Sequence, residues 1–167
     1  EKSPVIKLNL RGDINNKEFS SNVGKILGII LPVEVGSVIK KEEISVISTG
    51  PNEWLIISNN TVKSEKNNYD LENTLFEKIS KKNFGAVTNI TDQFTIFSLT
   101  GSNISEILSK SSPFDFDKLS YNHSAQTLLN NVDITIIKKD NENIDLLVRR
   151  SFSEYLWAWL NDSARFF

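Results

Sequence analysis

The feature that most constrains the fold is an order of secondary-structure patterns that occurs twice along the chain. Alternating polar and apolar residues predict strands, and apolar residues spaced by three or four predict helices. In each half these patterns give an initial strand region, a helix, a two-stranded hairpin and a second helix. They lie at 5–10, 19–30, 44–58 and 70–79 in the first half and at 86–100, 103–108, 132–149 and 151–160 in the second. The sequence therefore predicts an α+β fold.

The repeated order indicates an internal duplication. The first strand region of each half ends in a similar way, in LNLRGD at 8–13 and FSLTGS at 97–102. We therefore predict two duplicated strand-helix-hairpin-helix units, at about 5–82 and 86–165, with helices packed on mainly antiparallel sheets. Each unit is short for independent folding, so we expect one compact domain over residues 1–167.

Capping signals predict where three of the helices begin. Asp70 is a candidate N-cap, and Asn103 followed by Glu106 resembles a capping box. Ser151 followed by Glu154 fits the S-x-x-E capping box and predicts the start of the last helix.

The last helix carries more aromatic residues than one buried face can cover. Trp157 lies about 140° from Phe152 on a helical wheel, outside the predicted apolar stripe. Its indole is therefore either covered by another segment or exposed for a partner, where aromatic residues are enriched. The predicted stripe consists of Phe152, Tyr155, Leu156, Trp159 and Leu160.

Composition excludes several classes of protein. The net charge is −2 and the basic residues are scattered, so the stripe typical of nucleic-acid binders is missing. No cysteine is present, which excludes disulfides and thiolate chemistry. The longest apolar run contains Gly28 and Pro32 and is far shorter than the roughly 20 residues of a membrane span. We expect a cytoplasmic protein without a signal peptide, and with neither nucleic-acid nor membrane partners.

The chain shows no motif for catalysis or cofactor binding. Glycine-rich phosphate loops and the G-x-S-x-G nucleophile elbow are missing from the sequence. His123 is the sole histidine, and we expect it in an exposed polar loop at 120–125 rather than as a general base. One histidine without cysteines is also a poor basis for a zinc site. We therefore predict no catalytic, cofactor-binding or metal-binding residues in this chain.

Four segments carry a family resemblance that extends, in order, over nearly the whole chain. The most specific is RRSFSEYLWAWL at 149–160, and the next is GPNEWLI at 50–56. LNLRGD at 8–13 and AQTLL at 125–129 add to it. Together they resemble the gamma subunit of heterotetrameric sarcosine oxidase.

The resemblance implies a non-catalytic accessory subunit. That complex oxidatively demethylates sarcosine to glycine and passes the one-carbon unit to tetrahydrofolate. The implied partners are the alpha, beta and delta subunits, mainly alpha, and they hold the flavins, NAD, folate and zinc. The implied fold is that of a divergent relative of the folate-binding domain of aminomethyltransferase, the glycine-cleavage T-protein. Trp157, Arg149 and Arg150 are our candidate partner contacts.

Two alternatives remain open at this stage. The chain could be a stand-alone folate or one-carbon-binding protein of the same fold, with an acid for the pterin and basic groups for the glutamate tail. Candidate residues for such a site are Asp92, Asp115 and Asp117 with Arg149 and Arg150. An accessory scaffold of the same fold, with another role, is the third possibility.

Overall fold

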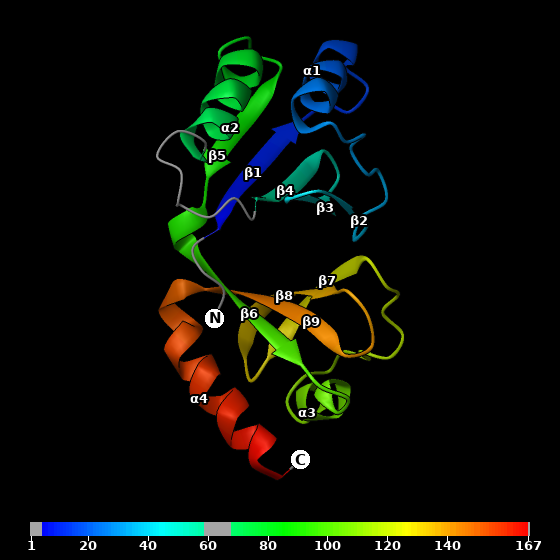
Figure 1. The fold of residues 1–167 in the computed structure, drawn as a ribbon, viewed down its shortest axis with the longest axis vertical. Coiled ribbons are helices and arrows are strands. Elements are labelled where there is room, and N and C mark those ends of the chain that lie inside the picture. Colours follow the sequence, from blue (N-terminus) through cyan, green and yellow to red (C-terminus); the bar gives the residue numbers. More distant parts are fainter. Residues whose placement is uncertain (1–4, 59–67, 167) are drawn as a thin grey trace. The chain divides into compact units, whose positions relative to one another are not determined.

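The computed structural model confirms an α+β fold with antiparallel sheets. It describes residues 5–58 and 68–166. These residues form two compact units, one within 5–91 and one within 92–166, and each unit contains a single sheet with its own helices (Figure 1).

The sheet of the first unit has the strand order β2-β3-β4-β1-β5, in which each strand pairs antiparallel with its neighbours. Its strands are β1 (Ile6–Gly12), β2 (Val38–Lys41), β3 (Ile44–Gly50), β4 (Glu53–Ser58) and β5 (Gly85–Asn89). Its helices are α1 (Lys17–Leu27) and α2 (Asn68–Leu75), which continues into a π-helical turn (Phe76–Ser80). The helices cover one face of the sheet, because apolar residues of both elements share a core. That core includes Leu8, Leu10, Phe19, Val23, Trp54, Ile56, Leu75 and Ile79.

The sheet of the second unit has the order β6-β9-β8-β7 and is also antiparallel. Its strands are β6 (Phe94–Thr100), β7 (His123–Leu129), β8 (Val132–Lys138) and β9 (Asn143–Arg149). Its helices are α3 (Ile104–Ser109) and α4 (Ser153–Ser163), and both pack on the same face of the sheet (Figure 1). The shared core includes Phe97, Ile104, Leu108, Ile134, Ile136, Leu146, Leu156 and Leu160.

The two units share one topology. In each, a first strand leads to a helix, then to a meander of three strands, then to a second helix, and the first strand pairs beside the last strand of the meander. The expected hairpins are thus three-stranded, because β2 and β7 precede them. β5 pairs with β1 and belongs to the first sheet, so the first unit extends beyond the expected boundary at 82. That the units form one domain stays a prediction.

Of the three helix starts that capping signals predicted, only the one at Asn103 is right, and it lacks the expected capping hydrogen bond. α2 is described from Asn68 to Leu75, so Asp70 lies inside the helix rather than before it. Asn103 stands at the start of α3, but its side chain makes no capping hydrogen bond. Ser151 lies in a 3-10 turn (Arg150–Phe152), and α4 begins after it without a side-chain cap. A capping pattern cannot distinguish an α-helix start from such a turn, since both place the same residues close together.

The first helix shows how a helix end is set in this chain. The side chain of Asn16 accepts hydrogen bonds from the amides of Glu18 and Phe19 and caps α1. Gly28 ends the helix in the left-handed conformation, with φ of 64°. Ile30 therefore lies beyond the helix and is 88% exposed, rather than on its apolar face.

Gly12 gives the buried ring of Phe19 its place against the first sheet. It pairs with Gly85 on the neighbouring strand. A Cβ atom on Gly12 would collide with the Phe19 ring, and one on Gly85 would collide with the carbonyl oxygen of Arg11. Both positions therefore need a residue without a side chain.

We expect Gly12→Ala to destabilise the fold by about 1–3 kcal/mol, the usual cost of overpacking a core. The Phe19 ring is fully buried, and a Cβ atom on Gly12 would lie 2.3 Å from its nearest atom. Urea denaturation measures the loss. The control is Gly50→Ala, whose added carbon would meet only the Glu53 carboxylate at an ordinary distance of 3.9 Å. Equal stability of the two variants would contradict the close packing at Gly12.

Glu53 ties β4 to β1 on the sheet face away from the helices. Its Oε1 accepts hydrogen bonds from Asn9 Nδ2 at 2.6 Å and from Arg11 Nη2 at 2.8 Å. Partial burial by itself would raise the pKa of Glu53. The hydrogen bonds from Asn9 and Arg11 and the positive charge of Arg11 outweigh burial and hold the pKa below its ordinary value of 4.5.

A lowered pKa makes the stability contributed by Glu53 dependent on pH. The contribution is present above pH 4.5 and is lost as the pH falls through the lower pKa of the folded state. We expect Glu53→Gln to lower the melting temperature at pH 7, and the gap to wild type to narrow below pH 4.5. Thermal melts across this range test it, with Glu43→Gln, on an exposed turn, as the control. A difference in melting temperature that stays constant with pH would show that the ionised carboxylate of Glu53 does not contribute to stability.

Candidate functional site

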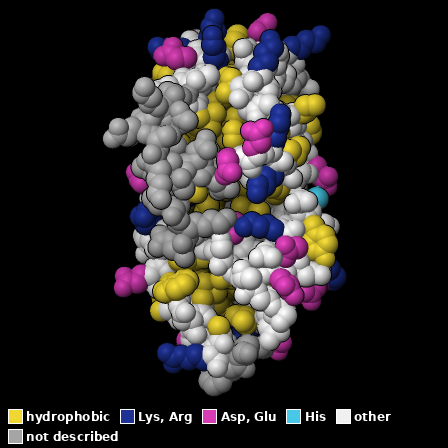
Figure 2. Space-filling model, in the orientation of Figure 1, with side chains coloured by type: hydrophobic (Ala, Val, Ile, Leu, Met, Phe, Trp, Pro, Cys, Tyr) yellow, Lys and Arg dark blue, Asp and Glu magenta, His cyan; other side chains and the backbone are white. Residues whose placement is uncertain are grey.

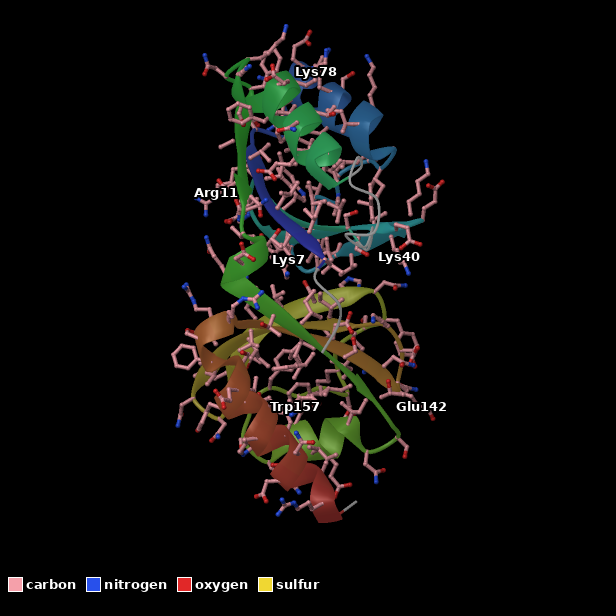
Figure 3. The ribbon with its side chains drawn as sticks, turned by 60° about the vertical axis from the view of Figure 1, so that its left-hand side comes forward. Lys7, Arg11, Lys40, Lys78, Glu142 and Trp157 are labelled. Atoms are coloured by element: carbon pink, nitrogen blue, oxygen red, sulfur yellow. The ribbon has the colours of Figure 1, made fainter. Side chains whose placement is uncertain are left out.

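The most distinctive exposed side chain of the second unit is Trp157 on α4. Trp157 is 46% exposed, and its indole packs on Phe97 of β6, with ring centroids 5.5 Å apart and planes tilted by 34°. Phe97 is almost completely buried. Figure 3 shows Trp157 directed from α4 toward the sheet. The indole is therefore partly covered by another segment of the chain and partly exposed. The sequence had left these as two separate alternatives.

A hollow of about 390 Å³ lies beside Trp157, lined by Phe97, Ser153, Glu154 and Trp157. Ser153 Oγ donates to the carbonyl oxygen of Arg150 at 2.7 Å, so its hydroxyl proton is already used. The carboxylate of Glu154 is exposed and has no hydrogen bond or ion pair to any residue in 5–58 or 68–166. We call these four residues the α4 hollow. It combines an aromatic wall with an available negative charge.

The predicted apolar stripe of α4 is only partly right. Leu156 and Leu160 are buried, and Trp159 is partly buried against the same core. Phe152 and Tyr155 are exposed instead. Phe152 precedes the helix, in the 3-10 turn, so the helical wheel does not apply to it.

Neither Arg149 nor Arg150 lines the α4 hollow. Arg149 pairs with Phe94 across the strands, and its guanidinium lies 5.9 Å from the centre of that ring. Because side chains alternate along β6, Phe94 and Phe97 point to opposite faces of the sheet. Arg150 Nε donates to the carbonyl oxygen of Asp92 at 2.8 Å. The structure therefore does not bring Arg149 and Trp157 together on one surface.

A second hollow of about 430 Å³ lies on the face that carries Arg149. Strand residues form its lining, in which Phe94, Leu128, Ile134 and Leu147 are apolar and the other five residues are polar. The polar residues include Gln126, Thr127, Asp133, Thr135 and Arg149.

The acids proposed for a folate site are not gathered around the arginines. Asp115 forms an ion pair with Lys118 at 2.9 Å, and the hydrogen bond from Lys118 lowers the pKa of Asp115. Asp117 is exposed in the same loop. Within the residues that the structure describes, no hydrogen bond or ion pair joins Asp115 or Asp117 to Arg149 or Arg150. Only Asp92 approaches an arginine, and it does so through its backbone.

His123 is the first residue of β7 and is half-buried, whereas the sequence predicted an exposed loop. Its Nδ1 lies 3.1 Å from the carbonyl oxygen of Tyr121.

Among the described residues, no group of three histidine, aspartate or glutamate side chains could hold a metal ion. No helix in this part of the chain is long and apolar enough to cross a membrane.

A loop with exposed aliphatic side chains follows α1, and it was not predicted from the sequence. Ile30, Val33 and Val35 are 88%, 73% and 55% exposed in the loop before β2. The loop is held in place because Trp54 Nε1 donates a buried hydrogen bond of 2.7 Å to the carbonyl oxygen of Pro32. Trp54 is itself buried in the core of the first unit. The signal for this loop was the aliphatic run at 26–33, of which we assigned the part up to Ile30 to the helix.

Charged side chains do not form a surface of one sign in the view of Figure 2. Lysine and arginine alternate there with aspartate and glutamate. This agrees with the near-neutral net charge of −2. On this face, therefore, no region is distinguished by a field of one sign.

Comparisons with known proteins identify the fold and the family. The chain is similar to a structure of heterotetrameric sarcosine oxidase from Corynebacterium sp. U-96 in complex with pyrrole 2-carboxylate. The identity is 23% and the TM-score 0.84, over 98% of this chain and 80% of that one. It also resembles glycine cleavage system aminomethyltransferase T from Bartonella henselae, with 10% identity and a TM-score of 0.63, over 95% of this chain and 43% of that one.

No curated protein matches the sequence. The family model described as "Sarcosine oxidase, gamma subunit family" matches residues 11–165. The chain therefore belongs to the sarcosine oxidase gamma subunit family, as its sequence motifs predicted.

Proposed function

We propose that this chain is the non-catalytic gamma subunit of a heterotetrameric sarcosine oxidase. The observation that carries the proposal is the match of the gamma subunit family model over residues 11–165. The assembly oxidatively demethylates sarcosine to glycine and transfers the one-carbon unit to tetrahydrofolate. In this assembly the chain contributes structure and contact surface, and the reacting groups lie elsewhere.

The proposed partners are the alpha, beta and delta subunits, with alpha as the main contact, in a cytoplasmic complex. Flavins, NAD, folate and zinc are held by those partners. The half-exposed indole of Trp157 supports a role in assembly, because partly buried aromatic residues are typical anchors of interfaces. The exposed aliphatic loop at Ile30, Val33 and Val35 supports it independently.

A stand-alone folate-binding protein is the less favoured alternative. Its site would need the carboxylate of Asp92, Asp115 or Asp117 beside the arginines. Asp115 is paired with Lys118, and Asp92 meets Arg150 through its backbone carbonyl oxygen rather than its carboxylate. The family match concerns the gamma subunit, and the likeness to aminomethyltransferase T extends only to the fold.

The proposal is tested by recovering the chain from its native source under mild conditions and identifying what accompanies it. We expect a flavin-containing complex that oxidises sarcosine, and we expect the chain produced alone to be colourless and inactive with sarcosine. A chain that is recovered alone and binds tetrahydrofolate at micromolar concentration would favour the alternative. Stoichiometric flavin in the isolated chain would contradict the assignment of flavins to the partners.

We expect Trp157→Ala to weaken association with the other subunits by about 30-fold, which corresponds to the roughly 2 kcal/mol of an interface hot spot. The variant also loses the packing of the indole on Phe97, so thermal melting of the free chain is measured beside the binding. Phe76→Ala is the control, because Phe76 is a similarly exposed aromatic residue (45%) in the other unit. Loss of stability in the Trp157 variant with unchanged association would remove Trp157 from the interface.

A further inference from the structure

We propose that the α4 hollow receives an arginine side chain of a partner subunit, which stacks on the indole of Trp157 and pairs with the carboxylate of Glu154. The inference rests on the proposed function, and it specifies the chemistry that the partner presents at this surface. The inference rests on charge complementarity. The carboxylate of Glu154, which is unpaired within the described residues, and the exposed indole of Trp157 line one hollow, and a guanidinium group is complementary to both.

Glu154 and Trp157 are positioned to contact the same group. They stand three residues apart on α4, so their side chains are neighbours on the helix surface. Phe97 supports the indole from the sheet and fixes the ring beside the hollow. A cation above an indole face is attracted by the ring, and a carboxylate at its edge adds a direct ion pair. The hollow of about 390 Å³ is large enough for a guanidinium group.

The described part of the chain does not supply this cation itself. Arg150 is the basic residue closest to Glu154 in the sequence, but its Nε donates to the carbonyl oxygen of Asp92. No ion pair to Glu154 is formed by any lysine or arginine in 5–58 or 68–166. The position of Glu154 in the first turn of α4 favours an acid there through the helix dipole. The helix dipole does not explain why an exposed tryptophan, Trp157, lies beside Glu154.

An arginine fits the hollow better than a lysine or a free amine. The planar guanidinium can stack on an indole and offer parallel N–H groups to a carboxylate, whereas an ammonium is a compact and strongly hydrated charge. A small free amine needs a site that encloses most of its surface. Four residues on one helix and one strand cannot enclose it, but a side chain is held in place by the partner that carries it.

The test measures the affinity of the gamma chain for the remaining subunits, using Glu154→Gln and the matched control Glu18→Gln. Glu18 holds the same place in α1 as Glu154 holds in α4, so both variants lose the same interaction with a helix dipole. We expect Glu154→Gln to weaken binding about tenfold at low salt and to make the affinity less dependent on salt. Glu18→Gln should bind like wild type.

A double-mutant cycle distinguishes one shared contact from two separate ones. If a single guanidinium contacts both residues, Trp157→Leu and Glu154→Gln are non-additive, and Trp157→Phe retains part of the affinity because a ring remains. Equal affinity of the Glu154 and Glu18 variants overturns the inference and leaves the proposed function intact. Competition by millimolar sarcosine would assign the hollow to a free amine and also overturn it. A wild-type chain that fails to bind the other subunits overturns the proposed function and this inference together.

Discussion

Antiparallel pairing of the first strand of each unit beside the last strand of its meander is the contact on which the rest of the structure depends. β1 pairs with β4 from Ile6–Ser58 to Arg11–Glu53, and β6 pairs with β9 in the same arrangement. The pairing fixes the register, and the register decides which face every side chain occupies. It sets Glu53 opposite Arg11, and it sets Phe97 on the face that α4 covers.

Much of the fold could be predicted from the sequence, because alternation and helical spacing are strong where one face is buried. The elements that were missed lie at sheet edges. β2 is a short, largely exposed edge strand with little alternation, and β7 starts at a histidine within a polar stretch. β5 was recognised as a strand, but its pairing with β1 joins residues far apart in the chain, and no local pattern reports that. Capping patterns failed where a 3-10 turn replaced the first helical turn.

The candidate site was predictable only in part. The helical wheel set Trp157 apart from the buried stripe, and the structure shows a half-exposed indole. Its support by Phe97 could not be foreseen, because that contact joins β6 to α4 across the whole second unit. Glu154 was interpreted as a capping residue, since it fits the S-x-x-E spacing, whereas it lines the α4 hollow. Arg149 and Trp157 were grouped because they are close in sequence, but a strand and a helix carry them to different faces.

The stacked pair of Phe97 and Trp157 draws on the first strand and the last α-helix of its unit. During synthesis from the N-terminus, the phenyl ring is made early, and the indole follows only after β7, β8 and β9 have emerged. The pair can therefore form only after all four strands of the sheet have been synthesised. A truncated or misfolded chain cannot present it, however much of the sequence is intact. If the partner subunits bind at this surface, they would bind only gamma chains that are completely folded. Assembly of the complex would then exclude incompletely folded chains.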